Sequence, residues 1–145
     1  MLNTRDRYRK IQRYLNLLYD NMWKEITPIE DIKLLDCEYK ENNEFPDLAL
    51  FKDLDKNGEW GSGNDSHAWF HFEVNNDIAG AFLRVHTGRG GWDAENPQFI
   101  IYVDGEMRQG LDVNHRDILL DTGKSDIYVY GYTGPRIART RFLAV

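Results

Sequence analysis

The sequence predicts a mainly β protein, an antiparallel jelly-roll-like β-sandwich preceded by one amphipathic α-helix. Hydrophobic residues follow a helical period only in the first 25 or so positions. After Pro28, short runs rich in branched and aromatic residues alternate with Gly, Asn, Asp and Pro clusters, as they do in β proteins. The 145 residues, 41% hydrophobic and 29% charged, are enough for one domain with one core.

Segment 1–27 is expected to be a helical leader. Asn3 or Thr4 can cap its start, and Pro28 ends it at or before Thr27. Steps of three and four residues place one apolar stripe along it: Tyr8, Ile11, Leu15, Leu18 and Met22. We expect this stripe to dock on the chain's own β domain or on a neighbouring domain.

The charge is divided between the two parts of the chain. Residues 1–25 carry six basic and three acidic side chains, a net +3, so the remaining 120 residues carry −9 of the total −6. The overall acidity argues against general nucleic-acid binding. A basic arm for nucleic acid or for an acidic membrane surface stays open as the alternative interpretation of the leader.

Segment 28–145 is expected to form the sandwich, of a galactose-binding-domain-like kind, because strands recur with no helices between them. In the second strand, Phe70 and Phe72 face one side while Trp69 and His71 face the other. Strands are expected at 32–40, 67–74, 81–87, 98–104, 115–120, 125–132 and 139–145, with weaker ones at 47–52 and 106–109.

Three polar segments predict turns or loops, and two of them also resemble part of a functional motif. Asp104-Gly105 is typical of a tight hairpin turn. Segment 53–58 copies the first half of a calcium loop, but Asn64 stands where the bidentate Glu is required. The glycines of 87–91 precede acidic and loop-forming residues instead of opening a helix, so they do not form a phosphate cradle.

Composition also limits location and chemistry. The single Cys37 excludes internal disulfides and multi-thiolate zinc sites within one chain. No apolar run approaches the roughly 20 residues of a membrane span, and the charged N-terminus is unlike a secretory signal, so we expect a cytoplasmic protein. Two further patterns suggest chemistry that the sequence does not support. His67 and His71, about 13 Å apart on one strand face, cannot share a tetrahedral ion. The triplet starting at His115 lacks every other kinase element.

Three further segments, taken in order, are more specific than any of these motifs. They read NGEWGSGNDSHAWF at 57–70, GWDAENPQF at 91–99, and VDG at 103–105 continuing through QGLDVNHRD at 109–117. This order resembles the N-terminal domain of the cytosolic-type α-mannosidases of glycoside hydrolase family 38, particularly their bacterial branch. The resemblance runs from the opening helix to nearly the last residue, and Gly-Leu-Asp-Val-Asn-His is its most distinctive part.

The resemblance implies a retaining, metal-dependent parent enzyme that hydrolyses terminal α-mannosides. The family's catalytic domain carries a His-x-Asp metal motif and a nucleophilic Asp, and no segment here matches either. We therefore expect a non-catalytic fragment, inactive alone, with no catalytic residue, metal ligand or cofactor of its own. Its expected partner is the catalytic domain of the same polypeptide, which would hold a zinc-type divalent metal; a homo-oligomer stays open. The apolar final strand suggests a domain cut from a longer chain.

The candidate contact residues for the catalytic domain or for the rim of a sugar subsite belong to one polar loop and two predicted Gly-flanked loops: Asp112, Asn114, His115, Arg116, Trp60 and Trp92. The plainer interpretation is that Asp112 and Asn114 build a turn, and that the tryptophans are buried plugs.

Two other functions remain open. The first is an autonomous carbohydrate-binding module in which Trp60 and Trp92 are the stacking platforms. The second is the N-terminal jelly-roll of a family 2 β-glycosidase, which the strand pattern also resembles but which the Gly-Leu-Asp-Val-Asn-His segment fits poorly.

Overall fold

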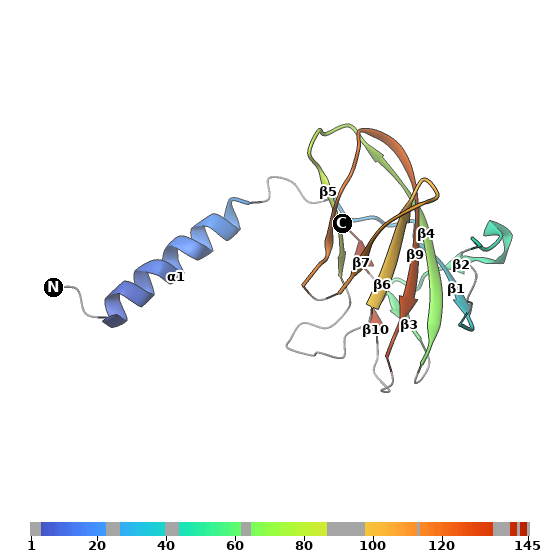
Figure 1. The fold of residues 1–145 in the computed structure, drawn as a ribbon, viewed down its shortest axis with the longest axis horizontal. Coiled ribbons are helices and arrows are strands. Elements are labelled where there is room, and N and C mark those ends of the chain that lie inside the picture. Colours follow the sequence, from blue (N-terminus) through green and yellow to red (C-terminus); the bar gives the residue numbers. More distant parts are fainter. Residues whose placement is uncertain are drawn as a thin grey trace.

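The computed structural model describes residues 4–22, 27–39, 44–61, 65–86, 98–112, 114–134, 140–141 and 143–144. One α-helix precedes a set of antiparallel strands in this part of the chain (Figure 1). The predicted mainly β fold with one N-terminal helix is therefore confirmed. We call the strand-bearing part, from residue 27 onward, the β domain.

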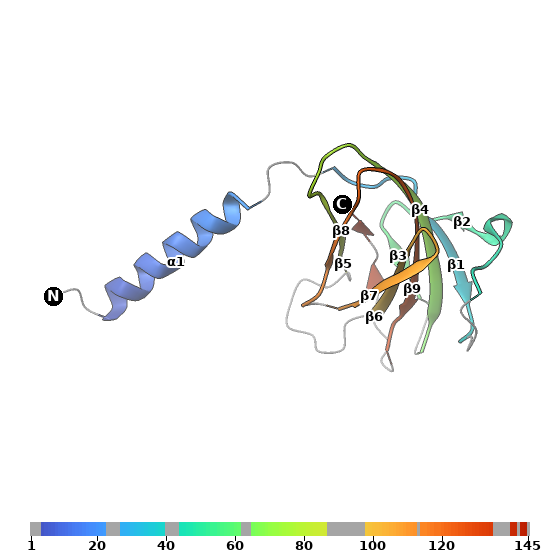
Figure 2. The same cartoon turned by 45° about the horizontal axis from the view of Figure 1, so that its top comes forward.

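Helix α1 spans Thr4–Asp20 and carries the predicted apolar stripe. None of its residues is buried, and Tyr8 and Leu18 are 64% and 70% exposed. The helix extends away from the strands in both views (Figures 1 and 2). It ends at Asp20, within the expected limit of Thr27, and the Asn21 side chain donates to the Leu17 carbonyl at 2.7 Å and so satisfies a terminal acceptor. The stripe therefore does not dock on the chain's own β domain in this structure, and docking on a neighbouring domain, the other expected arrangement, stays a prediction.

The main layer is a six-stranded antiparallel sheet in the order β2-β1-β4-β9-β6-β7. Strands β4 and β9 form its centre and pair over ten residues, from His67 opposite Tyr132 to Asn76 opposite Gly123. The strand bounds are β1 Lys33–Cys37, β2 Lys52–Asp53, β4 His67–Asn76, β6 Gln98–Val103, β7 Glu106–Leu111 and β9 Gly123–Tyr132.

Two smaller sheets complete the described strands. Strand β5 (Phe82–His86) lies between β8 (Asp117–Leu119) and β11 (Leu143–Ala144), and β3 (Glu59–Trp60) pairs with β10 (Thr140–Arg141). One hydrophobic core joins these sheets to the main sheet, because inward residues of all of them belong to one buried cluster, among them Trp60, Phe70, Phe72, Leu83, Val85, Phe99, Ile101, Ile118, Ile127 and Val129.

The predicted alternation along β4 is confirmed. Phe70 and Phe72 are buried in the core, while Trp69 and His71 lie on the opposite face of the sheet. The hairpin between β6 and β7 also forms where expected, since Asp104 (φ 52°) and Gly105 (φ 83°) both adopt the left-handed conformation that such two-residue turns require.

Segment 47–52 differs from its predicted strand. The Asp47 side chain accepts a hydrogen bond from the Ala49 amide at 3.0 Å, and this local bond starts a single 3₁₀ turn, η1 (Leu48–Leu50). Only β2, directly after the turn, pairs with a neighbour, β1. In the former calcium-like segment, the Asp55 side chain accepts from the Asn57 amide at 2.8 Å, which is the expected polar turn.

Candidate functional site

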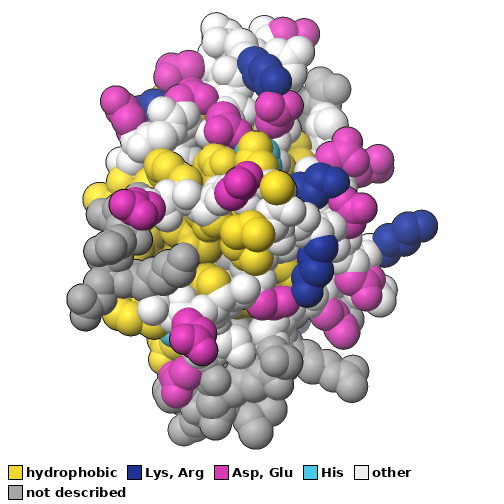
Figure 3. All heavy atoms as spheres, turned by 90° about the vertical axis from the view of Figure 1, so that its right-hand side faces the viewer, with side chains coloured by type: hydrophobic (Ala, Val, Ile, Leu, Met, Phe, Trp, Pro, Cys, Tyr) yellow, Lys and Arg dark blue, Asp and Glu magenta, His cyan; other side chains and the backbone are white. Residues whose placement is uncertain are grey.

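The outer face of the six-stranded sheet, opposite the core, is lined by rings. Because side chains alternate along each strand, the register places every second residue of β4 and β9 side by side on this face. We call its seven ring-bearing residues the aromatic face: His67, Trp69 and His71 of β4, Tyr128, Tyr130 and Tyr132 of β9, and Tyr102 of β6. Figure 3 shows hydrophobic side chains gathered in a band across this side of the molecule, with carboxylates on its flanks.

Half of the aromatic face is covered. The ring of Phe45 lies 4.8 Å from Tyr128 and 5.2 Å from Tyr102, measured between ring centroids. Phe51 packs beside Tyr128 and His71. Burial raises the pKa of the Tyr102 and Tyr128 hydroxyls, as expected when the charged form loses water. This half is a second small core and offers no open surface.

The rest of the aromatic face is accessible, and Tyr39, which follows β1, lies beside it. We call this group of four residues the open ring cluster: Tyr39, His67, Tyr130 and Tyr132. His67 stands at its centre, with centroids 4.8 Å from Tyr132 and 5.7 Å from Tyr130 and ring planes within about 21° of both. Tyr39 lies 5.6 Å from His67 at an angle of 55° and is 65% exposed. The cluster therefore combines ordered rings with an accessible ring surface.

Hydrogen bonds fix the polar tips of the open ring cluster. The Tyr130 hydroxyl lies 2.7 Å from His67 Nδ1, and the Tyr132 hydroxyl donates to the carboxylate of Asp65. Burial is the main cause that raises the pKa of Tyr130 to about 12. The bond to Asp65 raises the pKa of Tyr132, because ionisation would break it. Both hydroxyls thus stay protonated at neutral pH.

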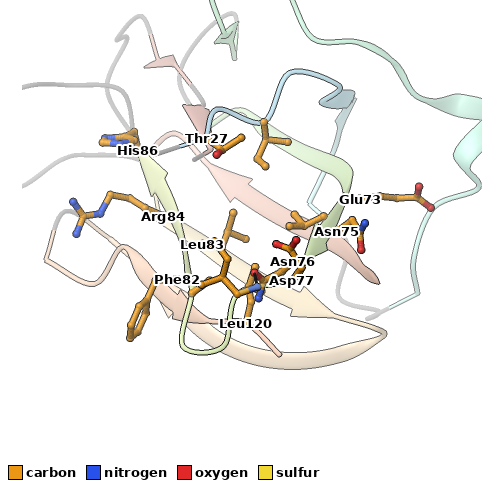
Figure 4. Close-up of a pocket in the computed structure, with 14 residues that line it drawn as sticks. Thr27, Glu73, Asn75, Asn76, Asp77, Phe82, Leu83, Arg84, His86 and Leu120 are labelled. Carbon is orange, nitrogen blue, oxygen red and sulfur yellow. Dashed lines mark hydrogen bonds between the residues drawn. The ribbon is translucent and has the colours of Figure 1, made fainter. Parts of the chain in front are cut away.

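A groove of about 460 Å³ lies elsewhere, between the end of β4, strand β5 and the segment that follows α1 (Figure 4). Its apolar lining is Ile29, Val74, Ile78, Ala81, Phe82, Leu83 and Leu120. Arg84, at its edge, makes a two-point contact with Asp117 at 2.6 and 2.7 Å, and Figure 4 shows Arg84 and Glu73 directed away from each other. Burial lowers the pKa of the nearby His86. The groove therefore has a mixed lining, because polar and charged residues line it as well: Thr27, Glu73, Asn75, Asn76, Asp77, Arg84 and His86.

The predicted polar loop forms a turn between β7 and β8. Asp112 Oδ1 accepts from the backbone amides of Asn114 at 2.7 Å and His115 at 2.8 Å, and it lies 3.0 Å from His115 Nδ1. The Arg116 carbonyl accepts from the Val85 amide at 2.9 Å. The interpretation that Asp112 builds the turn is thus supported, while contact of this loop with another domain stays a prediction.

We expect Asp112→Ala to destabilise the protein by about 1 kcal/mol at pH 7, because two backbone amides lose their acceptor. Those amides lower the pKa of the Asp112 carboxyl below its ordinary value, so the contribution is complete above that ordinary value and is lost as the pH falls through the lowered pKa. Urea unfolding of both proteins at pH 7 and at low pH measures this. Asn114→Ala is the control, since the bond described for Asn114 uses its backbone amide. A difference that persisted undiminished at low pH would contradict the assignment.

Of the two candidate tryptophans, Trp60 is buried, as the plainer interpretation predicts. Trp60 is only 5% exposed and packs edge-on against Phe70, with centroids 5.2 Å apart, and near Phe99 at 5.7 Å. The proposed role of Trp60 as an exposed stacking platform is therefore wrong, because its ring fills the core. Trp92 lies outside the described residues.

The turn at Asp112 and the open ring cluster lie at the same end of the main sheet. Gln98 at the start of β6 pairs with Tyr132, and Leu111 at the end of β7 pairs with Phe99. The turn at Asp112 is therefore two strands, roughly 10 Å, from the open ring cluster. Sequence reasoning missed this cluster, although tyrosines at every second position of 128–132 are the signal that could have shown it.

Comparisons with known proteins identified no relatives: no family model, no curated protein and no solved structure matches the chain. Among the described residues, no helix has the length and apolar character needed to cross a membrane. Within the same ranges, no three His, Cys, Asp or Glu side chains are grouped as metal ligands would be.

Proposed function

We propose that the chain is the non-catalytic N-terminal domain of a family 38 α-mannosidase, a jelly-roll, galactose-binding-domain-like sandwich that supports the catalytic domain or the rim of its substrate site. The observation that carries the proposal is helix α1, whose apolar stripe has no buried residue. The sequence resemblance supplies the identity of the parent enzyme.

The stripe of α1 calls for a partner surface. Most helical stability in proteins comes from packing an apolar face, and this 17-residue helix has no buried residue, so its stripe gains little stability from packing. Contiguous exposed apolar surface marks interaction sites. The five basic and two acidic side chains of Thr4–Asp20 also give the helix a net +3, which favours an acidic partner surface.

The groove supports the same conclusion. It is lined in part by Thr27 and Ile29, which follow α1 in the chain, so the stripe and the groove are neighbours in sequence. A catalytic domain in the same polypeptide would meet both at a high effective concentration. The groove and the stripe are then one interdomain contact region.

The proposal assigns the chemistry to the catalytic domain. A retaining glycosidase needs two carboxyl groups about 5 Å apart across the sugar, one as nucleophile and one as acid/base. The nucleophile and the divalent metal implied for the parent both belong to that domain. The residues of this chain then act by holding the catalytic domain and the substrate rim in place.

Two measurements test the proposal. The coding sequence that follows Val145 is expected to contain a His-x-Asp segment of the catalytic domain. The isolated 145-residue chain is expected to show no turnover of a chromogenic α-mannoside, with an authentic family 38 enzyme as the positive control. Turnover at about 1 s⁻¹ or faster, an ordinary enzyme rate, would show that the chain is itself a catalyst and would overturn the proposal.

A further inference from the structure

We propose that the open ring cluster, together with the carboxylate of Asp65, is a binding site for an uncharged pyranose sugar. This site is distinct from the stacking platform predicted at Trp60. It is also separate from the groove and the stripe of α1, which form the proposed interdomain contact region. The proposed function enters only in the choice of an α-mannoside as the first ligand to test.

The rings are suited to the apolar face of a sugar. Binding sites for small ligands combine aromatic walls with a few placed polar groups. Tyr39 offers the exposed ring surface, and His67 and Tyr132 stand beside it at centroid distances that keep them in contact with one another. Because β4 and β9 are the central strands, the site is built on the most extensively paired part of the main sheet.

The site is ordered before any ligand arrives. The bonds from Tyr130 to His67 and from Tyr132 to Asp65 hold the ring tips. The backbone amide of Asp65 donates to the Gly134 carbonyl at 2.9 Å, which fixes the loop that carries the carboxylate. A preformed site loses less conformational entropy on binding, so a small ligand can be held by few contacts.

The polar groups suit hydroxyls rather than anions. Asp65 is exposed, and its carboxylate offers about four lone-pair sites, so it can accept hydrogen bonds in addition to the one from Tyr132. The negative charge of Asp65 disfavours phosphate or sulfate groups, whereas sugar hydroxyls can donate to its carboxylate. Phe45 and Phe51 close the adjoining half of the face, which limits the site to a short ligand.

The first test is a titration of the full 145-residue chain with α-1,2-mannobiose, followed by amide chemical shifts in a ¹H–¹⁵N NMR spectrum. We expect saturable shifts centred on His67, Tyr130 and Tyr132, with a Kd of about 1–10 mM, the weak binding that a shallow site provides. Maltose and galactobiose serve as parallel ligands. Saturation by any of the three at these residues supports the site, and absence of saturable shifts with all three overturns it.

Two variants test the named groups. Tyr39→Ala removes the exposed ring, and Asp65→Asn removes the charge while Asn still tolerates the left-handed backbone of this position (φ 54°). Each is expected to weaken Kd by about fivefold or more, as the loss of an aromatic or charge-assisted contact does. Leu119→Ala, at an apolar residue 60% exposed on β8, is the control and should leave Kd within twofold.

Unchanged Kd in both folded variants would overturn the site. The mannosidase proposal is decided separately by the coding sequence after Val145, so the two ideas fail in distinguishable ways. If the site binds maltose or galactobiose but not mannobiose, the sugar site stands and its link to a mannosidase is lost.

Discussion

Trp60→Ala is expected to destabilise the protein by about 3–5 kcal/mol, the cost of removing a large aromatic side chain from a packed core. The indole ring is 5% exposed and fits between Phe70 and Phe99, so alanine would leave a cavity at this end of the two layers. Urea denaturation followed by far-UV circular dichroism measures the loss as a lower midpoint at an unchanged slope.

Tyr39→Ala is the matched control for an exposed aromatic residue. At 65% exposure, Tyr39 should contribute less than about 1 kcal/mol to stability, in the range usual for surface positions. If Trp60→Ala left the midpoint unchanged as well, the indole would not be buried, and its role as a sugar platform would have to be reconsidered.

Gly131→Ala is expected to cost about 1–3 kcal/mol through overpacking. A Cβ at this position of β9 would lie 2.7 and 2.8 Å from ring atoms of Phe99 and 3.1 Å from the indole of Trp60. Both rings are confined by the core, so neither can move aside without strain. The same denaturation experiment measures the change, and a second readout is the loss of dispersed methyl NMR signals around Phe99.

Gly110→Ala provides the comparison on β7. A Cβ there meets only the Phe99 carbonyl oxygen at 3.8 Å, an ordinary contact, so we expect a change within about 0.5 kcal/mol. Equal destabilisation by both substitutions would mean that general strand preference, rather than the contact with Phe99 and Trp60, explains the effect.

The strands were predictable because burial on one face imposes a period of two on the residues. The assignment of Phe70 and Phe72 to the core and of Trp69 to the outer face follows from that period alone. The hairpin at Asp104 was predictable because two-residue turns restrict the residue types that can form them. In both cases the cause lies within a few neighbouring positions.

Features that depend on which strands meet were not predictable. Trp60 lies in a two-residue strand beside Gly and Ser, and only its pairing with Thr140 shows that it belongs to a sheet. The open ring cluster forms only when residues 39, 67, 130 and 132 come together in space. A single sequence does not show which strands pair or in which register. The exposed stripe of α1 is a further case. The helical period of its apolar residues identifies the face that should be buried, but it does not identify the surface that buries this face.

The ten-residue pairing of β4 with β9 has a consequence for the order in which the chain can fold. His67 and Tyr132 are 65 positions apart in the sequence. Closing a loop of that length reduces the conformational entropy of the chain before the contact forms, and contacts between distant residues therefore slow folding. Until β9 has been synthesised, the β1–β4 pair and the β6–β7 hairpin each present an unpaired edge, because β9 lies between them. Such edges are where nascent chains aggregate, so during translation the protein is most vulnerable before Tyr132 leaves the ribosome.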